Sequence, residues 1–159
     1  DIPEVTDDDG TTVRIVCGNF RGQRGPVEGI AADPIYLDLS VPAGQRKTIS
    51  IELGRHAFAY IFEGDGSFRG SSDPRAVRTD LIGTDIPEIP STLGNRSLVL
   101  FDSGNEIVVQ AGEQGIRFLL VSGQPLREPV AWFGPIVMNT QAELRQAQQD
   151  IRNGTFIKA

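Results

Sequence analysis

The sequence predicts an all-β fold, an antiparallel β-sandwich or β-barrel with one helix near its C-terminus. Two observations predict it. Short apolar runs recur along the chain, and most of them alternate apolar with polar residues as half-buried strands do. The chain also holds 18 Gly and 10 Pro residues, a content typical of folds with many tight turns. Because no helical pattern separates the strands, a parallel βαβ fold is disfavoured.

Seven strands are expected. In the clearest of them, 35–41, four apolar residues share one face, and Tyr36, Asp38 and Ser40 share the other. The segment 48–53 repeats this alternation. The predicted strands are 12–17, 35–41, 47–53, 57–63, 97–101, 106–109 and 116–121.

Turn residues separate these strands. Pro42-Ala43-Gly44 follows one strand, a Gly-rich turn at 63–66 follows another, and 102–105 is predicted to join two apolar runs as a hairpin. The region 69–94 is different, because it is polar, contains three prolines and has no sustained period. We interpret 69–94 as a long loop inserted between two strands.

The helix is predicted over 140–153. Thr140 and Glu143 have the spacing of a capping box, in which each side chain satisfies a backbone N–H of the first turn. Gly154 provides the stop signal. The apolar face of the predicted helix consists of Leu144, Ala147 and Ile151. This face is narrow, which suits a helix packed on the outside of a sheet.

Composition limits the function. A chain of 159 residues fits a single domain, here 1–159. The net charge of −6 argues against nucleic-acid binding, and no apolar run is long enough to span a bilayer. A soluble, cytoplasmic protein is expected. Because the chain begins at Asp1 and not at Met, we expect a processed product or an excised domain.

Few residues are suited to catalysis. The single His, His56, cannot supply a site of several imidazoles, and we expect it at the surface. The single Cys, Cys17, lies among apolar residues and is expected as a buried structural thiol. The acidic run 7–10 resembles a calcium loop, but Val5 and Val16 occupy ligand positions, so a solvated turn is expected. We therefore predict no catalytic, cofactor-binding or metal-binding residue in this chain.

Three segments carry a resemblance to a known family. The stretches 118–130, 134–140 and 150–156 closely resemble the C-terminal cupin domain of pirin-like proteins. Residues 1–5 resemble the junction between the two domains of that family, and 57–64 resembles a cupin strand. The resemblance implies a cupin-type, jelly-roll-like antiparallel barrel with a C-terminal helix. The 69–94 region is longer than the family's connection at this point.

Pirin-like proteins are bicupins, with an iron-type metal in their N-terminal barrel, and some bacterial members oxidise quercetin. The resemblance therefore implies a metal-free, non-catalytic C-terminal domain that supports an N-terminal cupin barrel of the same parent chain. The parent would be a quercetin-dioxygenase-like oxidoreductase, and a homo-oligomer is left open. The alternative is a barrel that binds a small molecule without a metal, with a cavity lined by Phe58, Tyr60 and Leu100.

The segment between the last strand and the helix is the candidate contact region. Its prolines favour an extended path. Its large apolar residues, Trp132, Phe133 and Met138, either cap the barrel core or dock against a partner domain. In the intact bicupin, Arg127 and Glu128 would position the segment through ion pairs and backbone hydrogen bonds.

Overall fold

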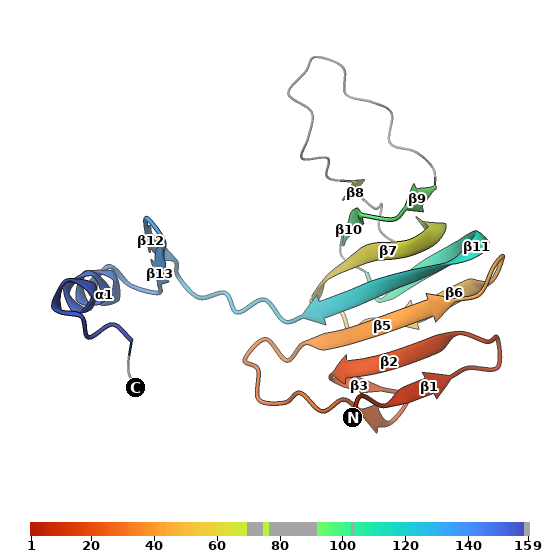
Figure 1. Cartoon of the computed structure of the whole chain (residues 1–159), viewed down its shortest axis with the longest axis horizontal. Helices are drawn as coiled ribbons and strands as arrows, with labels where there is room; N and C mark the ends of the chain where they lie inside the picture. Colours follow the sequence, from red (N-terminus) through yellow and green to blue (C-terminus); the bar gives the residue numbers. More distant parts are fainter. Residues whose placement is uncertain (70–74, 77–91, 103, 158–159) are drawn as a thin grey trace, which may run out of the picture. The chain divides into compact units, whose positions relative to one another are not determined.

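A computed structural model describes residues 1–69, 75–76, 92–102 and 104–157 (Figure 1). By its internal contacts the chain divides into two compact units, Asp1–Pro125 and Leu126–Ala159. In the described residues, no helix has both the length and the apolar character that crossing a membrane requires.

The first unit is antiparallel β-structure. Its main sheet has nine strands, with β1-β2-β5-β11-β7-β10-β8 in order, β6 paired with β11, and β9 paired with β7. A separate small sheet pairs β3 with β4. The strands are β1 (Glu4–Thr6), β2 (Thr12–Cys17), β3 (Asn19–Phe20), β4 (Gln23–Arg24), β5 (Ile35–Val41), β6 (Arg46–Ser50), β7 (His56–Arg69), β8 (Arg75–Ala76), β9 (Leu93–Gly94), β10 (Ser97–Phe101) and β11 (Glu106–Gly123).

Two long strands, β7 and β11, fold this sheet over on itself. Residues 116–123 of β11 pair with β5 and with the first part of β7, whereas 106–110 pair with β6. The core lies between the two parts. Phe68, near the far end of β7, packs edge-on against Phe118, with the ring centroids 5.3 Å apart. The all-β antiparallel prediction is confirmed, although the described strands form an open, folded sheet and not a closed ring.

Glycines permit the bend in these strands. Gly64 has a φ of +69°, and a Cβ there would lie 2.1 Å from the carbonyl oxygen of Gly115. A Cβ at Gly112 would meet the Asp65 carboxylate. The predicted turn at 63–66 is therefore a bend inside β7. The strands predicted separately at 106–109 and 116–121 are one strand, bent between them.

Three predicted strands, 12–17, 35–41 and 97–101, have the observed bounds. The strand predicted over 47–53 ends at Ser50, and Leu53 is 77% exposed beyond it. The predicted hairpin at 102–105 is wrong, because β10 pairs with β7 and β8, whereas β11 pairs with β5, β6 and β7. This connection crosses from one part of the sheet to the other.

The predicted insertion 69–94 lies mostly outside the described residues. Two of its short segments are described. Strand β8 pairs with β10, and strand β9 pairs with β7.

The second unit is a β-hairpin with a helix, formed by β12 (Ala131–Phe133), β13 (Ile136–Met138) and α1 (Gln141–Asn153). Here the predicted extended segment turns back on itself. The capping box of Thr140 and Glu143 and the left-handed Gly154 are confirmed. Helix α1 contacts both strands. The buried side chains of the unit are few and small or medium in size: Ala131, Leu144 and Ala147.

Candidate functional site

The outer face of the first unit carries large apolar side chains. Phe58 and Tyr60 of β7 and Leu100 of β10 are 38–39% exposed. Strand pairing places Leu98 and Leu119 on either side of Tyr60. Phe58 lies between Leu100 and Val121 in the same way. We call this set the apolar face: Phe58, Tyr60, Leu98, Leu100, Leu119 and Val121.

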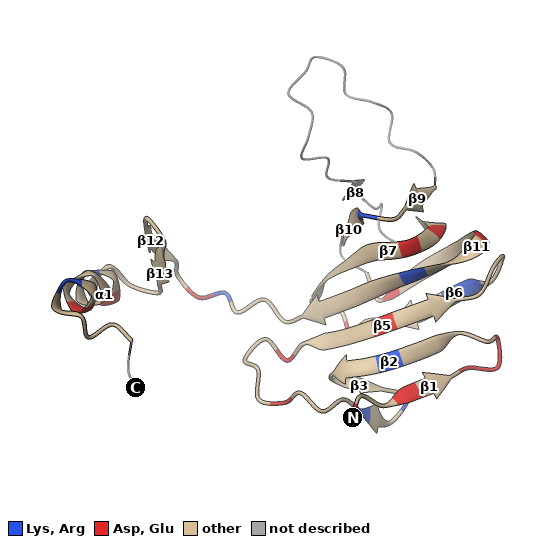
Figure 2. Ribbon diagram, in the orientation of Figure 1, with Lys and Arg blue, Asp and Glu red and all other residues tan. Residues whose placement is uncertain are grey.

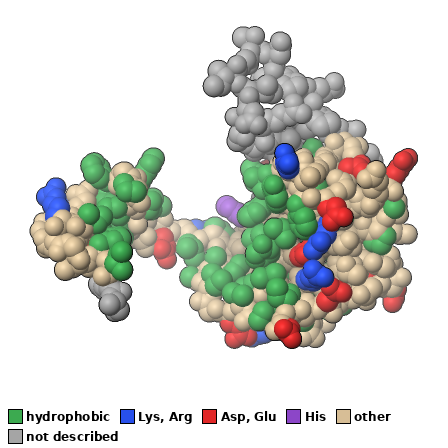
Figure 3. All heavy atoms as spheres, viewed as in Figure 1, with side chains coloured by type: hydrophobic (Ala, Val, Ile, Leu, Met, Phe, Trp, Pro, Cys, Tyr) green, Lys and Arg blue, Asp and Glu red, His purple; other side chains and the backbone are tan. Residues whose placement is uncertain are grey.

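This surface differs from an ordinary solvated sheet face. An antiparallel sheet with one face in water alternates apolar residues inward with polar residues outward. Here β7 points Ala59 and Ile61 inward, fully buried, and its aromatic residues outward. Phe58, Tyr60 and Leu100, which were predicted to line an internal cavity, therefore lie outside the core. Figure 3 shows hydrophobic side chains gathered on this face of the first unit.

A row of charges borders the apolar face and crosses five strands (Figure 2). Its members alternate in sign from β7 to β1: Glu63, Arg117, Asp38, Arg14 and Glu4. We call this row the charge ladder. Arg117 binds both carboxylate oxygens of Asp38, with N–O distances of 2.9 and 2.7 Å. Arg14 lies opposite Asp38 in the sheet and binds Glu4 at 2.7 Å.

Arg117 is held in place from several sides. Its hydrogen bonds to Asp38 raise the pKa of the guanidinium, so its charge is fixed. Its guanidinium carbon also lies 4.9 Å from the centroid of the Phe62 ring, a cation–π contact. A bidentate pair of this kind is rigid, so the ladder gives the face a fixed polar border.

An open depression of about 470 Å³ lies at one end of the apolar face. Phe58 and Leu100 line it together with His56, Phe101 and Asp102. His56 is exposed at the start of β7, which confirms its predicted surface position.

The interior does not fit the metal site of a cupin. Such a site needs imidazole and carboxylate ligands that converge from neighbouring strands. The single His of the chain is exposed, and the core-facing residues Ala57, Ala59 and Ile61 of β7 have no donor atoms in their side chains. Within the described ranges, no group of three His, Cys, Asp or Glu side chains is placed to hold a metal ion.

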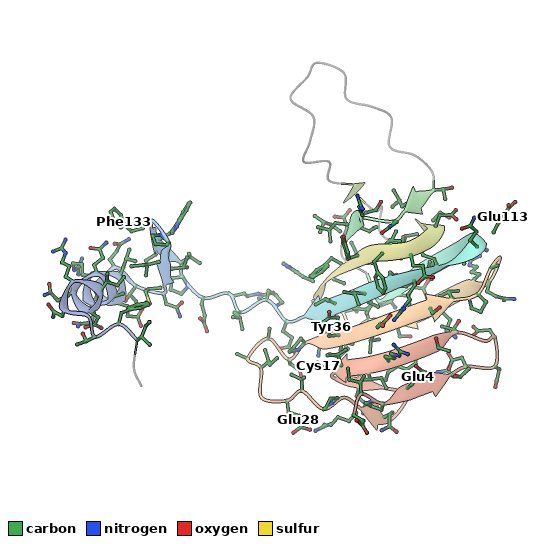
Figure 4. All side chains as sticks on the ribbon, viewed as in Figure 1. Glu4, Cys17, Glu28, Tyr36, Glu113 and Phe133 are labelled. Atoms are coloured by element: carbon green, nitrogen blue, oxygen red, sulfur yellow. The ribbon has the colours of Figure 1, made fainter. Side chains whose placement is uncertain are left out.

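A second pocket, of about 440 Å³, lies around Cys17 and the 18–35 loop (Figure 4 labels Cys17 and Glu28). Cys17 is buried, as predicted, and its thiol donates to the Val27 carbonyl. Arg55 is buried beside the pocket and binds Asp33 at 2.6 Å and Glu52 at 2.9 Å. Burial lowers the pKa of Arg55, but these hydrogen bonds outweigh it and raise the pKa overall. Two carboxylates therefore already neutralise Arg55 in this pocket.

A buried ionic cluster, which the sequence patterns do not predict, lies around Lys47. Lys47 points into the end of the core and binds Asp7 and, at 2.7 Å, Asp9. Asp7 also pairs with Arg21 at 2.6 Å. The side chains of Lys47 and Asp7 are only 8% and 2% exposed. The turn predicted at 7–10 is present and its Asp8 is exposed, but Asp7 is buried and not solvated as predicted. The signal was available, because Lys47 shares the inward phase of Ile49 in β6.

Hydrogen bonds set the ionisation of this cluster. The bond from Lys47, followed by one from the Thr11 backbone N–H, lowers the pKa of Asp9 to about 2. Burial lowers the pKa of Lys47, but the hydrogen bonds that it donates to Asp7 and Asp9 raise the pKa overall. Asp9 and Lys47 therefore both stay charged at neutral pH.

The second unit exposes most of its predicted contact residues. Trp132 is 73% and Phe133 64% exposed, whereas Met138 is half-buried (Figure 4 labels Phe133). Glu128 accepts a hydrogen bond of 2.7 Å from the side chain of Asn139. Arg127 is exposed, with a φ of +54°.

Comparisons with known families and proteins identify similarity to pirin proteins. The family described as Pirin C-terminal cupin domain matches residues 36–157. A pirin-like protein of Solanum lycopersicum is 34% identical over 97% of this chain and 47% of its own length. A pirin-like protein of Caulobacter vibrioides is 32% identical over 98% of this chain and 49% of its own.

A solved structure is also similar. The crystal structure of quercetin 2,3-dioxygenase from Acinetobacter baumannii superposes with a TM-score of 0.74 and 25% identity, over 98% of this chain and 48% of that one. The chain thus spans about half the length of the curated relatives it matches.

Proposed function

Because this chain belongs to the pirin C-terminal cupin domain family, we propose that it is the metal-free, non-catalytic half of a two-barrel protein. In this proposal the N-terminal cupin barrel of the same parent holds an iron-type metal and oxidises the substrate. The parent is a quercetin-dioxygenase-like oxidoreductase, and the present domain supports the shape of its partner barrel.

The donor set of this chain is the observation that carries the proposal. One exposed His56 and the apolar core-facing positions of β7 leave the interior without the ligands that an iron site in a cupin needs. The core is packed instead with apolar side chains, among them Phe118 and Phe68 in edge-on contact. Such an interior stabilises a fold and offers no open coordination position for a substrate.

The lengths of the relatives support the two-barrel part of the proposal. The matched pirin-like proteins and the quercetin 2,3-dioxygenase of Acinetobacter baumannii are each about twice as long as the segment that they share with this chain. The metal-bearing barrel is then expected in the part of the parent that this chain does not match.

Metal analysis of two proteins tests the proposal: the 159-residue chain and the two-barrel parent. After identical loading with Fe²⁺ and removal of excess metal, the parent is expected to retain about one metal ion per chain, as a single mononuclear site would. The present chain is expected to retain only a trace, and quercetin turnover is expected in the parent alone. Stoichiometric iron in the present chain, lost in His56→Ala, would overturn the proposal.

A further inference from the structure

We propose that the apolar face and its charge ladder form the docking surface for the companion barrel of the same parent chain. The inference rests on the proposed function, because it names the surface through which the two halves meet. An interface of this kind has an apolar centre, rich in aromatic residues, and a polar border. The apolar face provides the centre, with Phe58 and Tyr60, and the ladder provides the border.

The position of the N-terminus supports this occupant. Strand β1 is the edge strand of the sheet, and its Glu4 is the last member of the charge ladder. Asp1 lies three positions before Glu4, and three extended residues span at most about 10 Å. A barrel that precedes Asp1 in the parent is therefore connected at the edge of the same sheet, next to the Glu4 end of the charge ladder.

The order of charges argues against a second copy of this chain as the occupant. From β7 to β1 the signs run −, +, −, +, −, which reads the same in both directions. If two copies met face to face about a two-fold axis with their ladders aligned, each charge would oppose a like charge, Asp38 against Asp38 at the centre. A shift by one strand, about 4.8 Å, would relieve this but would displace the apolar faces from each other.

The chemistry of the partner surface follows from the two ends of the ladder. Arg117 and Asp38 already satisfy each other, whereas Glu63 lies 3.8 Å from Arg117 and is largely exposed. Glu4, at the other end, already binds Arg14 at 2.7 Å. The partner surface therefore has an apolar centre and a basic side chain that faces Glu63.

Thiol labelling tests the surface directly. The native Cys17 is buried, so a maleimide reports on a cysteine introduced elsewhere. Tyr60→Cys places the probe on the apolar face, and Leu53→Cys is the matched control, because Leu53 is also an exposed apolar residue but lies outside that face. Labelling rates are compared between the two-barrel parent and the 159-residue chain.

We expect the thiol of Tyr60→Cys to react with maleimide at least about tenfold more slowly in the two-barrel parent than in the 159-residue chain. A tenfold reduction means that exposing this thiol in the parent costs about 1.4 kcal/mol of free energy. Leu53→Cys should react at the same rate in both. Equal rates for Tyr60→Cys would overturn the docking surface, and so would protection that grows with the concentration of the isolated chain, the sign of a second copy. Metal analysis reports separately on the proposed function: iron in the isolated chain contradicts that function whatever the labelling shows.

Discussion

The two faces of strands β7, β10 and β11 are both apolar, but the structure uses them differently. The inner face packs Ala59, Val99 and Phe118 at zero exposure, whereas the outer face leaves Phe58 and Tyr60 more than a third exposed. The largest side chains of β7 thus point away from the core that the strand helps to form. The difference shows that the outer aromatic residues lie outside the core, where their partial exposure fits the proposed contact with another surface.

Removal of a core aromatic should have the largest effect. Phe118 is fully buried and meets Phe68 edge-on, so Phe118→Ala loses both its burial and its ring contact and leaves a cavity. We expect the free energy of unfolding to fall by about 3–5 kcal/mol. Urea unfolding of the chain, followed by circular dichroism, measures the change. A loss below about 1 kcal/mol would mean that the inner face is not the packed one.

The buried ionic cluster should be the next most sensitive part of the interior. Asp7→Ala leaves Lys47 buried with Asp9 as its remaining partner. Removal of one partner of a buried ion pair costs about 3–5 kcal/mol, and we expect about 2–3 here because Asp9 remains. The same urea titration measures it, with Asp8→Ala as the control, because Asp8 is exposed in the same turn. Equal effects of the two substitutions would contradict the buried role of Asp7.

The ionisation of Asp9 makes the stability of the cluster depend on pH. Its pKa is lowered from 3.8 to about 2, so its contribution is present above pH 3.8 and is lost as the pH falls toward 2. The difference of about 1.8 between these two pKa values corresponds to about 2.4 kcal/mol at most, and solvent screening of the partly exposed carboxylate lowers that figure. Thermal melts between pH 5 and pH 2 should show a smaller decline for Asp9→Asn than for the unaltered chain. Parallel declines would argue that Lys47 does not hold Asp9.

Sequence patterns predicted the fold well where each signal was local. The alternation in 12–17, 35–41 and 97–101 and the capping box at Thr140 gave the observed elements, because backbone geometry there depends on adjacent residues. Around Gly112 the sequence predicts a gap between two strands, whereas the structure has a bend within one strand. A glycine permits both a turn and a bend, and the choice depends on distant pairing partners.

The candidate surface was harder to predict. Phe58 and Tyr60 were assigned to an internal cavity, because on a strand with apolar residues on both faces the alternation does not say which face is inward. In the structure, Val99 and Phe118 of the neighbouring strands fill the core, and this decides which face of β7 points inward. Lys47 was missed for the opposite reason, because a charged residue in the inward phase of a strand is rarely buried without partners, and its partner Asp7 is forty residues away.

The smallest effect on the chain itself is expected on its outer face. Phe58→Ser exchanges an exposed ring for a polar group, so the free energy of unfolding of the 159-residue chain should change by no more than about 1 kcal/mol, against the several lost in Phe118→Ala. The same substitution in the two-barrel parent removes part of the proposed docking surface, and proteolysis at the junction near Asp1 should become faster. A large loss of stability in the isolated chain would show that the outer face also belongs to its core. Unchanged proteolysis of the parent would separate these aromatic residues from the contact between the barrels.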